Sequence, residues 1–438
     1  MKISVSGLRG IYGSDLNLYE ICNYAELFGS RLSDQGRKCV LGRDTRSSSH
    51  IISRVFESTL MKRGIDILNV GIAPTPVVFR EARKSHAGCM ITASHNPLDW
   101  NGLKFIIDGR GFYEKELSEM LEQSVQQTSL SYGCSVNVIS TYTDELLELV
   151  ADMQIKKDKK IGIDPGGGAA CIYSNTVFRS LGYKIASIND TFGIHPRSPD
   201  PTVDDLNELR ALVRSSSLDL GFALDLDGDR LVVIDKTGKK LSPDLTLLLC
   251  ISSAMKLGMT KFVLSVDTSS VVKEFILRHG GQVHFTKVGE ANVVMEISEK
   301  GADAGGEGSS AGFIMPKFNK CRDGLLAGVL ISSLDNESIN ECTRLSSKYR
   351  QIRSKLAVNS SLHKALVERL LDMLTPNSSS TLKIDGIKLV IDETSWVLIR
   401  ASNTEHAIRI SVESTADKAS ALHKDILTKT KLVFDEIR

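Results

Sequence analysis

This sequence lacks a long apolar run, a paired-cysteine motif and an excess of either charge. Its longest apolar stretch, residues 245–251, is far shorter than the roughly 20 residues of a membrane-spanning helix. The opening MKISVSGLRG has no apolar segment of the kind found in signal peptides. We therefore expect a cytoplasmic protein without a membrane partner.

The charges nearly cancel, because the chain has 54 Lys and Arg residues and 53 Asp and Glu residues. They are also interleaved along the chain, so we expect no basic surface of the kind that binds nucleic acid. Any anionic partner should be a small molecule that is gripped locally. The eight cysteines form no C-x-x-C and have no metal-ligand spacing with the nine histidines, which predicts buried thiols in a reducing compartment.

A chain of 438 residues has room for about three domains. Up to residue 349, strand-like runs alternate with amphipathic helical segments in three stretches of similar plan. This alternation predicts an α/β protein with parallel or mixed sheets, whose functional loops follow the carboxyl ends of the strands. After Tyr349 we expect two amphipathic helical stretches, a Ser-rich segment, and a β-rich end with a helix over 416–437, forming a smaller α+β domain.

Residues 92–97, TASHNP, follow a predicted strand at 89–91 and form the first candidate site. The Asn-Pro pair enforces a turn, which would present Ser94 and His95 on a stiff loop. The alternative is a polar turn in which Ser94 caps a helix. Lys104 has an apolar neighbour on either side, so we expect partial enclosure to lower the pKa of its ammonium toward the range of acid–base catalysis.

Asp225, Asp227 and Asp229 stand within five residues, between two apolar runs. At 4 Å and an effective dielectric of 20, each pair of carboxylates repels by about 4 kcal/mol. A hard divalent cation such as Mg²⁺ would remove this cost. An EF-hand is excluded, since Arg230 and Lys236 replace its glycine and its bidentate glutamate. The other interpretation is a solvated acidic hairpin turn, because Asp-Gly is a common hairpin dipeptide.

Two further loops carry groups suited to a sugar phosphate. In the glycine-rich residues 305–312, Glu307 and Ser309 could hydrogen-bond sugar hydroxyls, unless the segment is simply a flexible loop. Residues 400–405, together with Arg409, combine guanidinium, hydroxyl and amide groups. Such a set would clamp a phosphate, unless it forms only a capped turn.

Two other polar segments favour structural roles. Residues 42–47, GRDTRS, are interpreted as the start of a helix, although their arginines could face an anion. Residues 322–324, RDG, are interpreted as an ion pair at a helix start.

In their order along the chain, the four loops resemble those of the α-D-phosphohexomutase family. TASHNP is similar to its phosphoserine loop, DLDGDR to its metal loop, GEGSS to its sugar loop, and RASNTE with Arg409 to its phosphate loop. The opening SGLRG resembles the first-strand motif of the family. Within the family, ISVSGLRG and GGEG are most similar to the archaeal-type phosphoglucosamine mutase subgroup.

The resemblance implies four domains around a central active-site cleft. Three would be related α/β units with mixed sheets, and the fourth a smaller C-terminal α+β domain. The implied division assigns 1–148 to the phosphoserine (catalytic) domain, 149–250 to the metal-binding domain, 251–355 to the sugar-binding domain and 356–438 to the phosphate-binding domain.

The resemblance also implies an isomerase that interconverts hexose 6-phosphate and hexose 1-phosphate. Phosphoserine 94 would give its phosphoryl group to the sugar, with a hexose 1,6-bisphosphate as intermediate and activator. The partner would be this small-molecule hexose phosphate, and the chain would be a monomer or a homodimer. A hinge at the fourth domain would release and re-grip the phosphate that does not react.

The resemblance assigns roles residue by residue. One Mg²⁺ per chain would be held by Ser94, Asp225, Asp227 and Asp229. Lys104 would transfer protons, and the phosphoserine would be surrounded by Arg9, His95, Asn101 and Arg230. The ring hydroxyls would be held by Glu307 and Ser309. The phosphate that does not react would be held by Arg400, Ser402, Asn403, Thr404 and Arg409.

One departure from the family pattern leaves the sugar open, because Ser310 stands where glycine or alanine is usual. Leu226 and His406 replace frequent prolines, which we expect the fold to tolerate. The opening motif favours glucosamine phosphate, with mannose or glucose phosphate as the alternative. A hydrolase built on Ser94 would not need the second phosphate clamp, and no acid of the Ser-His-Asp kind is evident. A non-catalytic sugar-phosphate-binding member would not need Ser94 and Lys104 intact.

Overall fold

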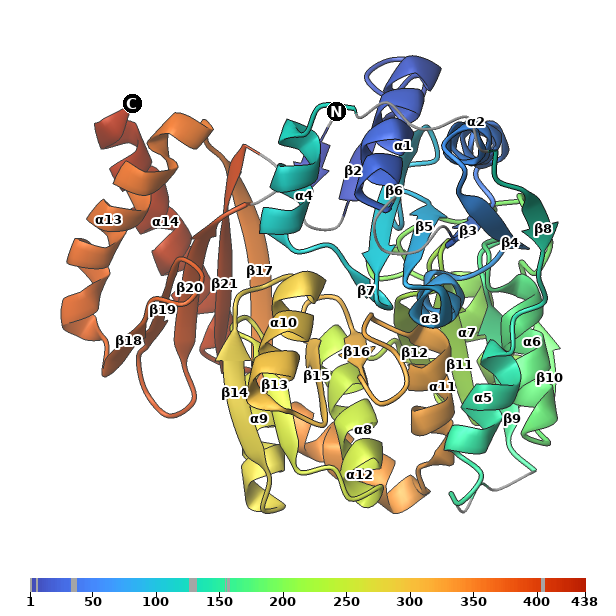
Figure 1. Cartoon of the computed structure of the whole chain (residues 1–438). Helices are drawn as coiled ribbons and strands as arrows, with labels where there is room; N and C mark the ends of the chain where they lie inside the picture. Colours follow the sequence, from blue (N-terminus) through green and yellow to red (C-terminus); the bar gives the residue numbers. More distant parts are fainter. Residues whose placement is uncertain are drawn as a thin grey trace.

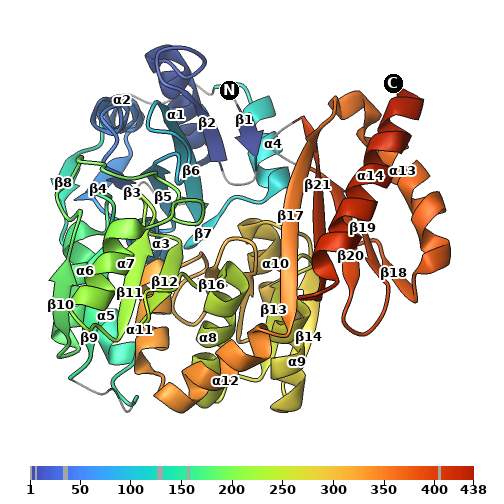
Figure 2. The ribbon, with the colours of Figure 1, turned by 180° about the vertical axis from the view of Figure 1, so that it is seen from behind.

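The computed structural model describes residues 2–4, 7–32, 38–125, 132–153, 155, 158–402 and 406–438. Their strands form four sheets that follow one another along the chain, with helices packed over them (Figure 1; Figure 2). This arrangement confirms the expected α/β architecture of three related units and a smaller last one. None of the helices in these ranges is long and apolar enough to cross a membrane.

The first sheet has the strand order β1-β2-β6-β5-β3-β4-β8, with β7 paired to β6. Helices α1 and α2 cover the face that carries Leu41 and Cys89, and α3 covers the face that carries Val40 and Met90. Burial on both faces explains why the central strands β3 and β5 are apolar over most of their length. The strands are β1 (Lys2–Ser4), β2 (Gly7–Ile11), β3 (Lys38–Arg43), β4 (Asp66–Ile72), β5 (Ala87–Ile91), β6 (Trp100–Ile107), β7 (Arg110–Gly111) and β8 (Ser135–Asn137). The helices are α1 (Leu18–Leu32), α2 (Ser49–Lys62), α3 (Thr75–Ser85), α4 (Glu114–Glu122) and α5 (Tyr142–Leu149).

The second and third sheets repeat one design, with the orders β10-β9-β11-β12 and β14-β13-β15-β16. In each, the last pair is antiparallel and the other pairs are parallel. The second unit contains β9 (Lys160–Asp164), α6 (Cys171–Ser180), β10 (Lys184–Ser187), α7 (Asn207–Ser215), β11 (Leu220–Leu224) and β12 (Leu231–Asp235). The third contains α8 (Pro243–Lys256), β13 (Lys261–Ser265), α9 (Ser270–Arg278), β14 (Gln282–Thr286), α10 (Glu290–Lys300), β15 (Ala304–Glu307), β16 (Gly312–Ile314), α11 (Gly324–Ser333) and α12 (Asn336–Ser346).

The same four-strand order occurs inside the first sheet, as β4-β3-β5-β6. There too the last pair is antiparallel and the others are parallel. Three antiparallel connections therefore occupy equivalent positions in the three units: β5–β6, β11–β12 and β15–β16. They contain the serine loop, the aspartate loop and the glycine-rich loop. The similarity of plan in the sequence thus corresponds to a repeat in structure.

The fourth sheet is antiparallel, in the order β17-β21-β20-β19-β18. Helices α13 and α14 cover one face and close an apolar core of its own, which includes Leu366 and Ile399. The other face meets the third unit, where Lys388 Nζ donates to the Val266 carbonyl over 2.8 Å. The elements are β17 (Tyr349–Ala357), η1 (Ser360–Leu362), α13 (His363–Leu374), η2 (Thr375–Asn377), β18 (Ser380–Leu382), β19 (Ile387–Val390), β20 (Trp396–Ala401), β21 (Ala407–Thr415) and α14 (Ala419–Ile437).

One expectation about this last unit is wrong. The sequence predicts two helical stretches after Tyr349, but the first is the strand β17, which pairs with β21 along its whole length. Cross-strand pairing decides the conformation here, because local propensity is a weak constraint on a segment of mixed period. The fourth sheet consequently begins before residue 356, where we expect the last domain to start. The expected boundary at residue 250 falls inside α8.

Candidate active site

Ser94 lies in the connection between β5 and β6 and has a left-handed backbone conformation, with φ of +53°. This conformation costs a residue with a Cβ about 1–2 kcal/mol, so its neighbours must hold it in place. The Ser94 amide donates to Thr92 Oγ1 over 2.8 Å, and the residue is fully buried. The next element is the strand β6, so Ser94 is not a helix cap.

The three aspartates occupy the connection between β11 and β12. At most 1% of any of these residues is exposed, so the interpretation as a solvated turn is wrong. The fold brings this loop against the serine loop, 131 residues away in sequence, and Ser94 Oγ donates to Asp225 Oδ2 over 3.2 Å. Two motifs that lie far apart in the sequence are therefore side by side in the structure.

The aspartate cluster fits a metal ion. One carboxylate oxygen from each residue lies within 4.8 Å of the others, a spacing that a single cation can bridge. Within the described part of the chain, Oδ1 of Asp227 and Oδ1 of Asp229 are buried and have no hydrogen-bond partner. Unsatisfied buried carboxylate oxygens are costly, and a hard cation with oxygen ligands would satisfy them.

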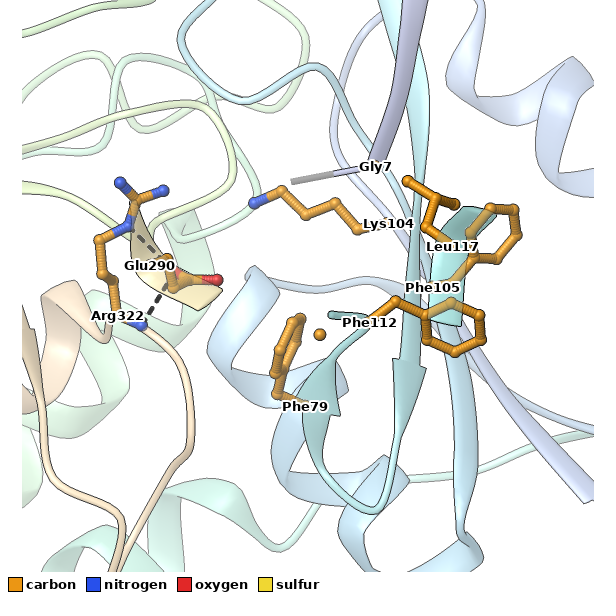
Figure 3. Close-up of a pocket in the computed structure, with 9 residues that line it drawn as sticks. Gly7, Phe79, Lys104, Phe105, Phe112, Leu117, Glu290 and Arg322 are labelled. Atoms are coloured by element: carbon orange, nitrogen blue, oxygen red, sulfur yellow. Dashed lines mark hydrogen bonds and ion pairs between the residues drawn. The ribbon is translucent and has the colours of Figure 1, made fainter. Parts of the chain in front are cut away.

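Lys104, on β6, points from the first unit toward Glu290 and Arg322 (Figure 3), and its ammonium reaches the same cluster. Its Nζ donates to Asp227 Oδ2 over 2.8 Å and to Asp229 Oδ2 over 3.1 Å. Burial lowers the pKa of Lys104, as the sequence suggests, but the two carboxylates raise it by more, so the pKa lies above its ordinary value. The expected lowering is therefore wrong, and Lys104 is a cation. Beside it, a cavity of about 20 Å³ is also lined by Glu290 and Arg322, and such a space holds about one water molecule.

The carboxylates differ in their affinity for a proton. Burial raises the pKa of Asp225, and the neighbouring Asp227 and Asp229 carboxylates raise it further. Burial also acts to raise the pKa of Asp229, but the cations around it, led by Arg322, lower it overall. Opposed shifts of this kind within one cluster are typical of functional sites.

Arg9 and Arg230 lie at the edge of the cluster. Burial lowers the pKa of Arg9, and the nearby Asp227 opposes this effect. The Arg230 amide donates to Asp225 Oδ1 over 3.1 Å, and its guanidinium lies 3.5 Å from Asp200 Oδ2. The positive charge of both side chains therefore acts on the aspartates.

His95 and Asn101 have different surroundings. His95 Nδ1 lies 3.2 Å from Ser94 Oγ, and burial together with nearby arginines lowers the pKa of the imidazole, so the ring is neutral. Asn101 is fully buried and donates from Nδ2 to the hydroxyls of Ser48 and Ser49, over 2.8 and 2.9 Å. Its side chain thus braces the start of α2.

Arg322 connects the aspartate loop to the glycine-rich loop, a role that the sequence interpretation misses. Its guanidinium lies 2.9 Å from Asp229 Oδ2, 3.0 Å from Glu290 Oε2 and 3.4 Å from Glu307 Oε2. The expected helix-start role holds for Asp323 alone, which caps α11. A single arginine between two loops 78 residues apart leaves no signal in the local sequence.

Glu307 ends β15 and is 3% exposed. Its Oε1 accepts from the Gly289 amide over 2.7 Å, and its Oε2 accepts from Ser310 Oγ over 3.3 Å. Burial raises the pKa of this carboxyl, although Arg322 opposes the shift. The segment is therefore a buried, hydrogen-bonded hairpin connection and not a flexible loop.

A second cavity, of about 310 Å³, lies between the third and fourth units. It brings together the predicted residues Ser309, Arg400 and Arg409, and Arg409 Nε donates to Ser402 Oγ over 3.3 Å. The remaining lining residues are Asp267, Arg353, Ser354, Lys355 and Ser411. The predicted residues Asn403 and Thr404 lie outside the described part of the chain.

Two cations of this second cavity, Arg353 and Lys355, are not among the predicted residues. Lys355 on β17 is the cross-strand partner of Arg409 on β21, which in turn faces Arg400 on β20. Directly opposed residues share one face of a sheet, so three cations form a row across three strands. The helical interpretation of this segment concealed an alternation that would have placed Arg353 and Lys355 on the same face.

Comparison with known proteins identifies the family to which these loops and this fold belong. Models of the phosphoglucomutase/phosphomannomutase alpha/beta/alpha domains I, II and III match residues 1–132, 140–238 and 242–352, and the model of the C-terminal domain matches residues 350–428. A probable phosphoglucosamine mutase of Methanothermobacter thermautotrophicus is 33% identical over 434 residues, which cover 96% of this chain and 95% of that protein. The chain belongs to the α-D-phosphohexomutase family.

Other phosphohexomutases match it over similar lengths. A phosphoglucosamine/phosphogalactosamine mutase of Sulfurisphaera tokodaii is 30% identical, over 93% of this chain and 94% of that protein. A solved phosphoglucomutase/phosphomannomutase family protein from Burkholderia thailandensis superposes with a TM-score of 0.85, over 98% of this chain and 97% of that one, at 23% identity. The expected family, enzyme class and four-unit fold are confirmed, and the roles of single residues stay predictions.

Proposed function

We propose that this phosphohexomutase interconverts hexose 6-phosphate and hexose 1-phosphate, with Ser94 as the phosphoryl carrier. The observation that supports this most is the 3.2 Å contact between Ser94 Oγ and Asp225 Oδ2, inside a buried cluster of carboxylates and cations. Phosphoryl transfer depends on positioning and on neutralising the charge of the transferred group. A held hydroxyl beside such a cluster meets both requirements.

In each half of the reaction, one bond to phosphorus forms and one breaks. Ser94 Oγ bonds to a phosphorus of hexose 1,6-bisphosphate while the bond from that phosphorus to the sugar oxygen breaks. The sugar oxygen takes the proton that the serine hydroxyl loses. This is the second half of the cycle. In the first half, phosphorylated Ser94 gives its phosphoryl group to the free hydroxyl at the other end of the hexose monophosphate: the bond from Ser94 Oγ to phosphorus breaks, a bond from the sugar oxygen to phosphorus forms, and the proton of the sugar hydroxyl passes to Ser94 Oγ. The net change is therefore the position of the phosphoryl group on the hexose.

The residues near Ser94 have separate tasks in this proposal. Lys104 keeps its proton at Nζ and can donate hydrogen bonds to oxygens that become more negative in the transition state. Neutral His95 would form a hydrogen bond with Ser94 Oγ through its Nδ1 atom. Arg9 and Arg230 offset negative charge at the edge of the cluster.

Asp225, Asp227, Asp229 and an oxygen on Ser94 are the residues that would hold one Mg²⁺. When bound, this ion supplies positive charge that polarises phosphoryl oxygens. The three carboxylates would hold it next to Ser94, because their loop is itself held by the β11–β12 pair and by Arg322.

The second cavity supports a mutase over a phosphatase. We propose that Arg400, Arg409, Ser402 and the undescribed Asn403 and Thr404 hold the phosphate that does not react, with Lys355 beside them. Glu307 and Ser309 would hold ring hydroxyls between the two anion sites. Because the bisphosphate must turn around between transfers, this grip must open. The fourth unit has its own core, which would let it move about the link between α12 and β17.

For the sugar we propose glucosamine phosphate, on the strength of the names of the relatives above and of the opening motif. Mannose phosphate and glucose phosphate are the alternative. The deciding experiment assays the purified protein with glucosamine, mannose and glucose 6-phosphates, Mg²⁺ and a catalytic amount of the matching bisphosphate, and compares kcat/KM. Turnover highest with glucosamine 6-phosphate supports the proposal. Release of inorganic phosphate without a 1-phosphate product would contradict it.

A further inference from the structure

Arg46 is a fully buried arginine that the proposed reaction does not use. It lies between β3 and α2, in the segment GRDTRS, and its side chain is 0% exposed. Its guanidinium makes five hydrogen bonds, one for each N–H group that an arginine side chain carries. A fully satisfied buried guanidinium fixes the groups around it.

Four of its acceptors are backbone carbonyls, three in the serine loop and one at the start of β6. The guanidinium donates to the Ser94 carbonyl over 2.6 Å, to the Asn96 carbonyl over 2.7 Å and to the Trp100 carbonyl over 3.1 Å. It also donates to the carbonyl of Pro97. The loop is therefore wrapped around one side chain from a different part of the first unit, and Arg46 faces peptide oxygens rather than an anion.

The fifth acceptor, Asp44, connects to the other side of Ser94. Arg46 Nε donates to Asp44 Oδ2 over 3.0 Å, and Thr92 Oγ1 donates to the same oxygen over 2.7 Å. Thr92 Oγ1 in turn accepts from the Ser94 amide over 2.8 Å. Both backbone polar groups of Ser94 are thus tied to the Asp44–Arg46 pair.

We infer that Arg46, supported by Asp44 and Thr92, is a positioning residue that holds Ser94 in its left-handed conformation, so that Oγ faces the aspartates. The inference rests on the proposed role of Ser94 as carrier. A left-handed serine relaxes to another conformation when its contacts are removed, and the direction of Oγ would change with the backbone. Lysine cannot replace the arginine, because an ammonium is a compact donor without the planar fork that reaches divergent carbonyls.

A purely architectural role predicts a different result from a positioning role. If Arg46 only stabilised the first unit, its loss would lower the melting temperature and leave the kinetics of the folded fraction intact. If it positions Ser94, kcat should fall while KM stays close to the wild-type value, because the substrate is bound elsewhere. Misplacement of a reacting atom by about 1 Å can cost on the order of 100-fold in rate.

The test compares Arg46→Lys with Arg63→Lys in the full-length protein. Arg63 is a second buried arginine of the first unit, 2.6 Å from Glu26, and it serves as the matched control. We expect Arg46→Lys to lose about 100-fold in kcat and to show faster amide hydrogen exchange in a peptide spanning residues 92–101. Arg63→Lys should lose stability without either change. Thr92→Val, which removes the link to the Ser94 amide, should reproduce the kcat effect if Arg46→Lys folds poorly.

Two results would overturn the inference: wild-type kcat in both Arg46→Lys and Thr92→Val, or unchanged exchange of the loop in Arg46→Lys. A failure of the proposed function would give different results from a failure of the inference about Arg46. It would show as absent turnover in the wild-type protein or as full turnover in Ser94→Ala, whereas the exchange measurement reports on the loop without any turnover.

Discussion

Lys104 Nζ lies 2.8 Å from Asp227 Oδ2, and this contact joins the first unit to the second. The ammonium offsets part of the repulsion among the three buried carboxylates. Burying such a cluster without partners would be strongly unfavourable. The site is therefore partly neutralised by the protein itself, and a cation that binds there adds to charge already in place.

Replacing Lys104 by methionine should remove this internal charge while keeping most of the packing. We expect kcat to fall by about 100-fold or more, the size of the loss when one preorganised hydrogen-bond donor to the transition state is removed. The measurement is steady-state kinetics at saturating Mg²⁺. Lys62→Met, at an exposed position of α2, is the control, and near-normal kcat in Lys104→Met would remove Lys104 from the mechanism.

Ser94→Ala should abolish mutase turnover without unfolding the protein, because only one hydroxyl is lost from a small buried side chain. Binding of hexose phosphate, measured by calorimetry, should persist, since the second cavity is intact. Ser58→Ala, on an exposed part of α2, should behave as wild type. Residual turnover in Ser94→Ala would assign the phosphoryl carrier to another residue.

The aspartate cluster should make stability depend on Mg²⁺. A ligand that binds only the folded state raises the melting temperature as its concentration increases, so the wild-type protein should melt higher with Mg²⁺ than with chelator. In Asp227→Asn this rise should be much smaller, whereas the exposed Asp190→Asn should keep it. Chelation should also stop turnover, and full activity in chelator would contradict the assignment.

The row of cations across the fourth sheet predicts an effect on substrate affinity. Hydrogen bonds to charged groups contribute about 1.5–3 kcal/mol, so Lys355→Met should weaken hexose phosphate binding by about tenfold or more. Arg350→Met is the matched control, because Arg350 lies on the same strand but on its opposite face. Equal effects of the two substitutions would argue against Lys355 as part of the anion site.

Lys388 predicts a pH dependence of stability. Burial at the junction with the third unit lowers its pKa from 10.5 to about 8, although Glu413 opposes the shift. Between these two values the unfolded chain binds the extra proton, so this group makes the folded state more stable as pH rises. The gain is at most about 1.4 kcal/mol per pH unit. The melting temperature of wild type relative to Lys388→Met should therefore increase from pH 8 to 10.5, and a constant difference would contradict this.

The sequence was sufficient for the features that are local. Apolar runs ending in TASHNP, DLDGDR and GEGSS predicted strands followed by functional loops, and those loops lie where the strands end. The same reasoning failed after Tyr349, because the residues of β17 become a strand only through pairing with β21, about 60 residues later. Because that strand was not predicted, Arg353 and Lys355 were not recognised as residues of the second cavity.

Features that depend on distant charges could not be predicted. The surroundings of Lys104 include carboxylates 123 and 125 residues away, and these reverse the direction in which burial moves its pKa. The partners of Arg322 and Arg46 likewise belong to other segments. Nothing in the local sequence of either arginine indicates which carboxylates or carbonyls it will meet.

The repeated hairpin position has a consequence for how this enzyme can be divided. Each of the three related units contributes its loop from the same place, yet in the proposed function one loop supplies the nucleophile, one the acidic ligands and one the contacts to the sugar. A unit excised from the chain would keep its motif but would have no mutase activity, because the other groups of the site belong to the other units. Activity is therefore a property of how the units are oriented against each other, and a change at their junctions can silence the enzyme while every motif remains intact.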